Sequence, residues 1–264
     1  MKRLDLFLVE KKIFSTREKA KLAIRNNAIM VEDKIINIPS KKINEDIKIK
    51  IVGKIMPYVS KGGLKLEKAI KEFCVSIKDK IILDIGSSTG GFTDCCLKNN
   101  AKLVYAIDVG INQLADELKK NPKVISMEET DFRELDISLI TSPNIVTIDI
   151  SFISLNLLVD KLNAVTNNET KIICLIKPQF ECGKEIASKY KGVINNKQIH
   201  IEILNKVIAD FASKNFTCLN LTFSPIKGKK GNIEYLALFQ KHKSSQPPKY
   251  NINEIVDFAY SHFD

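Results

Sequence analysis

The chain has 264 residues, and 44% of them are hydrophobic, which is enough for one large or two small domains with a substantial core. Its formal net charge is +10, and most of the excess lies in residues 1–60, which hold 14 Lys and Arg against 7 Asp and Glu. The sequence has no run of about 18 apolar residues and no apolar signal-peptide core, so we expect a cytoplasmic protein that neither is secreted nor spans a membrane. The basic first quarter predicts a polyanionic partner such as nucleic acid.

Cysteine and histidine usage argues against a metal site or a disulfide framework. The six cysteines form no Cys-x-x-Cys pair, and several fall inside apolar patterns, as core thiols in a reducing compartment do. The three histidines are scattered along the chain. We therefore expect no metal.

Residues 1–52 have the pattern of a small, separate α+β domain, and residues 53–62 have the composition of a linker. We expect an amphipathic helix near the start, then a helix capped by Ser15 or Thr16, and then short strands at 28–31 and 47–52. The basic side chains either solvate the helix faces or contact RNA, and the concentration of charge favours RNA. The candidate RNA contacts in this part are Arg3, Arg17, Lys21, Arg25 and Lys61.

A glycine-rich turn is the centre of the rest of the chain. A buried strand expected at 81–85 runs directly into the turn, whose glycines can adopt positive φ and let the backbone approach a ligand. The spacing is not that of NAD enzymes, because Ser88 stands where their second glycine is needed. An acid that ends the next strand is placed to accept hydrogen bonds from a ribose. These features favour S-adenosylmethionine (SAM) binding over an ordinary strand–turn–helix junction, and the candidate cofactor residues are Asp84, Gly86, Ser87, Ser88, Gly90, Gly91, Phe92 and Asp108, with Thr130 and Asp131 near the adenine.

Strands and helices alternate after residue 62, which predicts an α/β domain with a mostly parallel, Rossmann-like seven-stranded sheet. We expect this domain at 63–241 and a C-terminal connector and helix at 242–264. Residues 180–195 are expected to form a long loop, either an RNA-contacting lid or a plain connector. The other expected elements are helices at 63–73, 91–99, 111–119, 153–164, 198–213 and 251–262, and strands at 102–107, 123–127, 144–149, 171–176, 216–223 and 233–239, the last two as a hairpin.

Four charged residues lie at the ends of these elements: Lys65, Asp149, Lys177 and Glu234. A lysine at a strand end usually reaches for solvent, and a glutamate in a strand usually faces water. In an open α/β sheet, however, the carboxyl ends of neighbouring strands border the ligand crevice, so Asp149 and Lys177 are expected to converge there. The basic hairpin loop nearby carries Lys229 and Lys230, which we expect to contact phosphates.

Taken together, the four residues match the Lys-Asp-Lys-Glu tetrad of the FtsJ-like ribose 2′-O-methyltransferases. The surrounding phrases resemble the TlyA (haemolysin A) family, and residues 1–52 resemble the S4-like RNA-binding domain. The phrases are Tyr58-Val-Ser-Lys-Gly-Gly-Leu-Lys65, Asp84-Ile-Gly-Ser-Ser-Thr-Gly-Gly, Asp149-Ile-Ser-Phe-Ile-Ser-Leu, Lys177-Pro-Gln-Phe-Glu and Gly-Asn-Ile-Glu234-Tyr.

This resemblance implies SAM-dependent methylation of cytidine 2′-hydroxyls in the rRNA of one or both ribosomal subunits. A ribose hydroxyl is a poor nucleophile and needs a base. Lys177 is the candidate base, since a partly desolvated lysine near a second cation can have a lowered pKa. Lys65 would supply that cation or hold the ribose, and Asp149 and Glu234 would orient the lysine and the hydroxyl.

Other functions remain open at the level of the sequence. A non-catalytic, RNA-binding assembly factor could bind SAM without turnover, although binding alone does not need the whole tetrad. A membrane-lytic haemolysin lacks a spanning segment or a strongly apolar amphipathic helix. The glycine spacing disfavours a dehydrogenase. A pseudouridine synthase is disfavoured as well, because its chemistry does not need the glycine turn.

Overall fold

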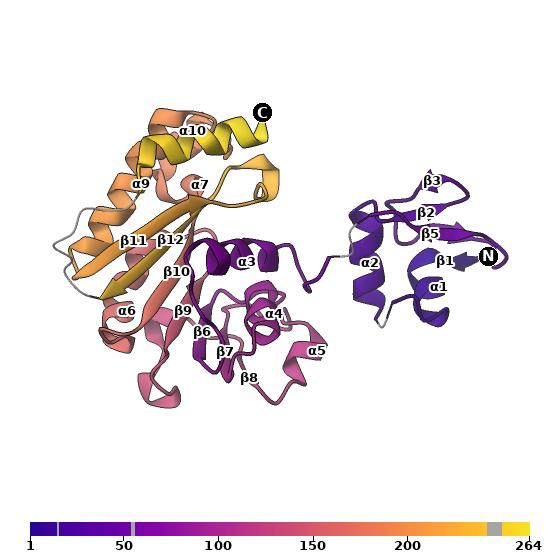
Figure 1. The fold of residues 1–264 in the computed structure, drawn as a ribbon, viewed down its shortest axis with the longest axis horizontal. Coiled ribbons are helices and arrows are strands. Elements are labelled where there is room, and N and C mark those ends of the chain that lie inside the picture. Colours follow the sequence, from indigo (N-terminus) through magenta and orange to yellow (C-terminus); the bar gives the residue numbers. More distant parts are fainter. Residues whose placement is uncertain (15, 54–55, 242–249) are drawn as a thin grey trace. The chain divides into compact units, whose positions relative to one another are not determined.

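The computed structural model describes residues 1–14, 16–53, 56–241 and 250–264, and it separates into two compact units, Met1–Lys61 and Gly62–Asp264 (Figure 1). Residues 54–55, in the linker expected at 53–62, lie outside the described residues. So do residues 242–249, which directly follow the expected domain end at residue 241. Those domain limits stay predictions.

The described residues of the first unit form two helices and two small antiparallel sheets. The hydroxyl of Thr16 accepts a hydrogen bond from the backbone N–H of Lys19 and so caps the second helix, as expected. The core is formed by apolar side chains of both helices and of the longer strands, including Leu4, Leu8, Ile24 and Ile29. The elements are α1 (Leu4–Glu10), α2 (Arg17–Arg25), β1 (Lys2–Arg3) paired with β4 (Lys42–Ile43), and β2 (Ile29–Val31) between β3 (Lys34–Ile35) and β5 (Ile49–Ile51).

The second unit contains a seven-stranded sheet in the order β11-β12-β10-β9-β6-β7-β8. The strands from β10 to β8 are parallel, whereas β12 is antiparallel to both β10 and β11. The predicted mostly parallel sheet with an antiparallel last strand is confirmed. The strands are β6 (Ile81–Ile85), β7 (Leu103–Ile107), β8 (Val124–Met127), β9 (Ile145–Ile148), β10 (Lys171–Ile176), β11 (Phe216–Phe223) and β12 (Tyr235–Lys241).

Helices cover both faces of this sheet (Figure 1). Along β10, Ile172, Cys174 and Ile176 belong to an apolar cluster shared with α9 and α10, and the intervening Ile173 and Leu175 are equally buried. Burial on both faces explains the unbroken apolar runs of the parallel strands. The helices are α3 (Gly62–Glu72), α4 (Gly91–Lys98), α5 (Asp116–Lys119), α6 (Val159–Val165), α7 (Pro178–Glu181), α8 (Gly183–Lys189), α9 (Lys197–Ala212) and α10 (Ile252–Phe263), with 3-10 turns η1 (Phe132–Glu134), η2 (Ile137–Leu139), η3 (Leu155–Leu158) and η4 (Lys229–Gly231).

Several segments differ from the sequence-based expectation. The helix expected at 153–164 is the 3-10 turn η3 followed by α6. The helix expected at 111–119 is restricted to α5, because the carboxylate of Glu128 accepts hydrogen bonds from the backbone N–H groups of Gln113 and Leu114 and holds that stretch in a turn. The long loop expected at 180–195 was wrong, since the segment contains α8. Two glycines with positive φ, Gly183 and Gly192, bracket this helix, and they had suggested a loop.

Sheet register brings the charged residues to one edge. Asp149 follows the last residue of β9, and Lys177 follows the last residue of β10. Because β12 is antiparallel to β10, its first residue Tyr235 pairs with Ile176, so Glu234 lies beside Lys177. Three adjacent strand ends therefore supply three of the four tetrad residues at the carboxyl edge of the sheet.

Candidate active site

The four tetrad side chains form two ion pairs. Lys65 of α3 lies with its Nζ 2.5 Å from Oε2 of Glu234, and both side chains are almost completely buried. The Nζ of Lys177 lies 2.6 Å from Oδ1 of Asp149. Each lysine thus has its own carboxylate partner. Ionic groups at this depth require such compensation, because an unpaired buried charge is strongly unfavourable.

Two further side chains support these pairs. The Nζ of Lys177 donates a hydrogen bond to Oγ of Ser151 at 2.9 Å, and Nε2 of Gln179 donates to Oε1 of Glu234 at 3.3 Å. Gly228 packs so closely on the carboxylate of Glu234 that a Cβ there would lie 2.1 Å from Oε1. These contacts hold the amine of Lys177 and the carboxylate of Glu234 in fixed positions.

The glycine turn leads directly to this site. Gly86, Ser88 and Gly90 have positive φ, and a Cβ on Gly86 would lie 2.8 Å from the carbonyl oxygen of Asp149. Backbone N–H groups that the sequence had suggested for a ligand are already used, since those of Gly86 and Ser87 donate to Ile107 O and that of Gly90 donates to Ser87 O. The turn is therefore held rigidly by its own hydrogen bonds.

Asp84 lies behind the turn and is fully buried. Its carboxylate accepts hydrogen bonds from the hydroxyls of Thr93 and Thr147, at 2.6 and 2.8 Å. Burial raises the pKa of Asp84 to about 6, because desolvation disfavours the charged form more than the two hydroxyls favour it. Asp84 ties β6 to α4 and β9, so its contribution to cofactor binding would be to position the turn.

The residues of the turn fit SAM. Asp108 directly follows β7 and accepts hydrogen bonds from the N–H groups of Ser88 and Gly110, at 2.7 and 2.8 Å. Each carboxylate oxygen keeps a lone pair for a ribose hydroxyl. The Oγ of Ser87 is buried and has no hydrogen-bond partner among the described residues. A buried hydroxyl of this kind is expected to bond a ligand.

The other candidate cofactor residues take less direct positions. Gly91 and Phe92 begin α4, and the ring of Phe92 is buried in the core, so it supports the turn from behind. Thr130 donates to the carbonyl of Glu128, and Asp131 caps η1 and pairs with Arg133. The side chains of Thr130 and Asp131 are partly exposed just beyond β8.

The comparisons decide the family. Residues 58–241 match the FtsJ-like methyltransferase family, and residues 2–46 match the S4 domain. The chain is also 40% identical to "Hemolysin A" of Brachyspira hyodysenteriae, over 90% of this chain and 99% of that protein. It belongs to the TlyA (haemolysin A) family of FtsJ-like methyltransferases. The seven-stranded sheet of the second unit agrees with this membership.

Relatives of this FtsJ-like methyltransferase are similar over nearly their whole length. The chain is 43% identical to "Putative rRNA methyltransferase YqxC" of Bacillus subtilis, over 98% of this chain and 94% of that protein. It is 34% identical to the 23S rRNA (cytidine-2'-O)-methyltransferase TlyA of Campylobacter jejuni, over 89% of this chain and 98% of that protein. A solved structure titled "Putative hemolysin from Streptococcus thermophilus" is 40% identical, with a TM-score of 0.79 over 99% of this chain and 96% of that chain.

Sequence reasoning missed several residues around the tetrad. Phe152 has a positive φ of +72° and is 87% exposed. The centre of its ring lies 5.2 Å from the centre of the ring of Phe180. The buried carboxylate of Glu181 accepts from Oγ of Ser154 and from the backbone N–H of Leu155, and so fixes the segment after β9 on α7. The sequence did offer a signal for three of these residues, because the phrases that carry the family resemblance contain Phe152, Phe180 and Glu181.

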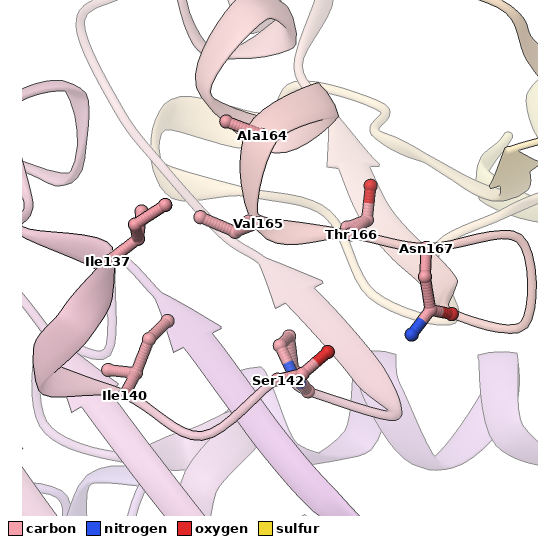
Figure 2. A pocket seen from close by; sticks show the side chains of 8 residues that line it. Ile137, Ile140, Ser142, Ala164, Val165, Thr166 and Asn167 are labelled. Carbon is pink, nitrogen blue, oxygen red and sulfur yellow. The ribbon is translucent and has the colours of Figure 1, made fainter.

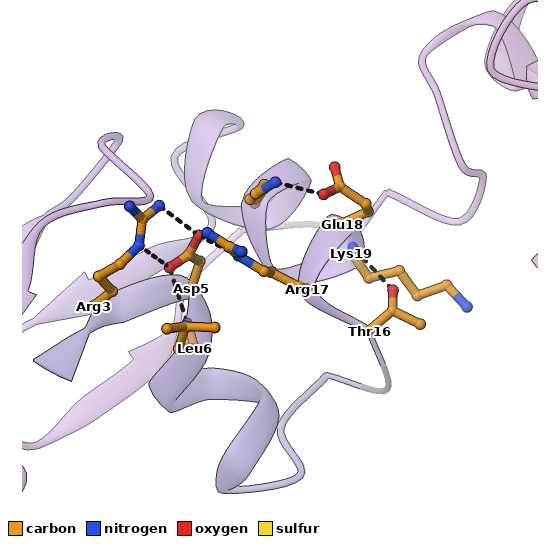
Figure 3. Close-up of polar contacts among 8 residues, drawn as sticks. Arg3, Asp5, Leu6, Thr16, Arg17, Glu18 and Lys19 are labelled. Carbon is orange, nitrogen blue, oxygen red and sulfur yellow. Dashed lines mark hydrogen bonds and ion pairs between the residues drawn. The ribbon is translucent and has the colours of Figure 1, made fainter. Parts of the chain in front are cut away.

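In the S4 unit, two candidate RNA contacts are held by one buried acid (Figure 3). The carboxylate of Asp5 is completely buried and pairs with the guanidinium groups of Arg3 and Arg17, each at 3.0 Å. The side chains of both arginines remain partly exposed, at 39% and 45%. Hydrogen bonds from Arg3 and Arg17 lower the pKa of Asp5 to about 2.

The remaining basic candidates lie at the surface. Lys21 pairs with Glu18 one turn earlier on α2, and Arg25 and Lys61 are exposed. Lys229 and Lys230 are exposed on η4 of the second unit, where Lys230 has a positive φ. All of these side chains are therefore accessible to a nucleic acid.

A cavity of about 320 Å³ lies at the opposite edge of the sheet (Figure 2). It is lined by Ile137 and Ile140, by the end of α6, and by residues just before β9 and β10. Its position at the amino ends of the parallel strands separates it from the tetrad. In the described ranges, no helix is long and apolar enough to cross a membrane, and no cluster of His, Cys, Asp and Glu could hold a metal ion.

Proposed function

We propose that this family member methylates the 2′-hydroxyl of cytidine in ribosomal RNA, with SAM as the methyl donor. The arrangement of Lys65, Asp149, Lys177 and Glu234 beside the glycine turn is the observation that carries the proposal. The names of the Bacillus subtilis and Campylobacter jejuni relatives support rRNA as the substrate, and the second name supports cytidine and its 2′-oxygen. An RNA-modifying role also favours a cytoplasmic location.

Lys177 is the residue that we assign as proton acceptor for the hydroxyl. SAM, when bound, supplies a methyl group on a sulfonium centre. The amine of Lys177 is held by Asp149 and Ser151, so its lone pair has a defined direction once the amine is neutral. After it takes the proton, the carboxylate of Asp149 at 2.6 Å stabilises the ammonium group.

The second ion pair would hold the ribose. Glu234 is fixed by Lys65, by Gln179 and by the close packing of Gly228. A carboxylate oxygen of Glu234 can accept from the ribose, and Lys65 can donate to it. Holding the hydroxyl in one orientation replaces a chance encounter with an aligned one, which is a large part of the rate gain for a weak nucleophile.

The exposed ring of Phe152 supports an unpaired nucleotide as the substrate. The positive φ of Phe152 is strained, and its 87% exposed side chain leaves a large apolar surface in water. Backbone outliers of this kind concentrate at functional sites. Aromatic side chains next to a nucleic-acid site stack on unpaired bases. The neighbouring Phe180 lies near Lys177, since the Nζ of Lys177 is 5.8 Å from its ring centre.

The S4 unit is assigned to binding the same RNA. Asp5 presents the guanidinium groups of Arg3 and Arg17 as one fixed, partly exposed pair, which suits phosphate or RNA backbone recognition. Lys21, Arg25 and Lys61, and Lys229 and Lys230 on the second unit, are the other proposed RNA contacts.

The test is transfer of labelled methyl from SAM to purified small and large ribosomal subunits that lack the modification. We expect label in at least one subunit, lost with Lys177→Ala and kept with Lys171→Ala, which changes a lysine at the other end of the same strand β10. SAM affinity should stay close to that of the unchanged protein in both variants. Transfer that survives Lys177→Ala in a folded protein would refute the base assignment, and tight SAM binding with no transfer to either subunit would favour the non-catalytic assembly factor.

A further inference from the structure

The ring of Phe223 connects three elements around the tetrad. Phe223 is the last residue of β11, and the Nζ of Lys68 on α3 lies 3.5 Å from the centre of its ring. His262 and Phe263 at the end of α10 contact the same ring, with ring centres 5.3 and 6.3 Å away. A lysine ammonium this close to a ring centre, with its side chain only 17% exposed, is well placed for a cation–π interaction.

The backbone of Phe223 lies next to Glu234. Phe223 pairs with Tyr235 across the β11–β12 ladder, and the following N–H of Ser224 donates to the carbonyl oxygen of Glu234 at 2.8 Å. The main chain of Glu234 is therefore bonded to the residue that directly follows Phe223. Any shift of Phe223 would be passed to Glu234 through this hydrogen bond.

Lys68 and Lys65 lie one helical turn apart on α3, so they share a face of the helix. These contacts form a closed circuit, that is, a ring of contacts that returns to its starting point. The ring of Phe223 contacts Lys68, and Lys68 and Lys65 lie on the same helix α3. Lys65 pairs with Glu234, whose carbonyl oxygen accepts the hydrogen bond from Ser224, the residue after Phe223. A closed circuit fixes the rotation of α3 relative to β12. Without these contacts, α3 would be freer to rotate and to draw the Nζ of Lys65 away from the carboxylate of Glu234.

The end of α10 secures the other side of the ring. Phe263 lies 4.7 Å from His262 between ring centres, and its carbonyl oxygen accepts a hydrogen bond from the Nζ of Lys227 at 3.3 Å. Lys227 begins the loop that carries Gly228, and Gly228 packs on Glu234. The C-terminal helix, which lies outside the matched residues 58–241, is thereby attached to the same circuit.

We propose that Phe223 and Lys68 are positioning residues for the methyl transfer, because they set Lys65 opposite Glu234. This inference rests on the proposed function. It assigns no contact with the substrate to either residue. Their effect is on the geometry of the Lys65–Glu234 pair and, through it, on the alignment of the ribose hydroxyl.

The test compares Lys68→Met and Phe223→Leu with Lys71→Met, a control that removes an exposed lysine from the same helix. Lys68→Met keeps the apolar stem and removes the cation, and Phe223→Leu keeps an apolar side chain and removes the ring. We expect kcat to fall about tenfold in both variants, with SAM affinity and the KM for ribosomal subunits unchanged, while Lys71→Met behaves like the unchanged protein. Lys68→Arg and Phe223→Tyr should restore most of the rate, because each keeps the cation or the ring.

The double variant Lys68→Met/Phe223→Leu should lose less than the sum of the two single losses, since both changes remove the contact of Lys68 with the ring of Phe223. Each change also removes contacts of its own, those of Lys68 with Glu72 and of Phe223 with His262 and Phe263. The inference would be overturned if Lys68→Met and Lys71→Met had the same kcat. It would also be overturned if the losses in kcat were additive in the double variant. A loss of SAM affinity in step with kcat would overturn it too, because it would indicate general destabilisation. Lys65→Ala separates the two proposals: full activity of Lys65→Ala would refute the tetrad assignment itself, whereas its inactivity with a fully active Lys68→Met would refute only the positioning role.

Discussion

Gly86 and Asp149 come so close together that a Cβ on the glycine would lie 2.8 Å from the carbonyl oxygen of the aspartate. The first residue of the glycine turn is thus in contact with the end of the strand that supplies a tetrad carboxylate. A side chain at position 86 would have to push β6 and β9 apart, because the atom in its way is backbone. A displacement of the proposed cofactor turn would therefore also displace the proposed catalytic residues at the end of β9.

Gly86→Ala should therefore damage both cofactor binding and catalysis. Positive φ alone costs an alanine about 1–2 kcal/mol, and the contact with Asp149 adds to this. We expect SAM affinity, measured by calorimetry, to fall by at least about tenfold. Gly183→Ala is the matched control, since Gly183 has a similar φ of +78° but a Cβ added there would meet nothing within 4 Å. Equal SAM affinities of the two variants would contradict the proposed role of the close approach.

Asp84→Asn should change how stability depends on pH. A folded-state pKa of about 6 lies above the ordinary value of 3.8, so the folded protein binds this proton more tightly than the unfolded chain does. Between about pH 4 and pH 6 the burial of Asp84 therefore makes stability decrease as pH rises, by up to about 3 kcal/mol in total. The free energy of unfolding of the unchanged protein, minus that of Asp84→Asn, should fall across this range and level off above it. A difference that is flat from pH 4 to pH 8 would contradict the raised pKa.

Asp5→Asn should loosen the S4 unit and weaken RNA binding. Asparagine cannot pair with two guanidinium groups, and we expect a loss of about 1–3 kcal/mol, discounted because both arginines are partly exposed. Hydrogen exchange at the amide of Leu6, which donates to Asp5, reports the loosening directly. The control is Asp33→Asn, whose pair with Lys50 is exposed and should contribute little. Unchanged exchange at Leu6 in Asp5→Asn would show that the buried acid does not organise the arginines.

Glu181→Ala should slow methyl transfer without affecting SAM binding. The change removes the acceptor for Ser154 and Leu155, so the segment with Ser151 and Phe152 loses its attachment to α7. We expect a several-fold decrease in kcat, because the amine of Lys177 is no longer held by Ser151 as firmly. Glu185→Ala, at an exposed position of α8, is the control. Equal rates for the two variants would exclude a positioning role for Glu181.

The sequence predicted the sheet well because each strand is signalled locally. The runs at 81–85 and 171–176 are buried on both faces, and the hairpin from β11 to β12 has a glycine-rich turn. The sequence-based prediction failed where a distant side chain determines the local structure. The backbone N–H groups of residues 113 and 114 donate to Glu128 and so shorten α5, and no local pattern encodes these hydrogen bonds.

The same distinction holds for the site. The end of a parallel strand is a place that the sequence can locate, so Asp149 and Lys177 could be expected together. Long-range contacts could not be foreseen: the burial of Asp84 between two threonines, the sharing of Asp5 by Arg3 and Arg17, and the contact of Lys68 with Phe223 all depend on the folded arrangement.

The most direct test of the central claim is the position of the transferred methyl group. After incubation of ribosomal subunits with labelled SAM and the protein, the rRNA is hydrolysed in alkali and the labelled products are identified by mass spectrometry. A methyl group on the 2′-oxygen removes the nucleophile that alkali needs, so our account predicts label in an alkali-resistant dinucleotide whose first nucleoside is 2′-O-methylcytidine. Label on a base, on a mononucleotide cleaved by alkali, or on another nucleoside would contradict it.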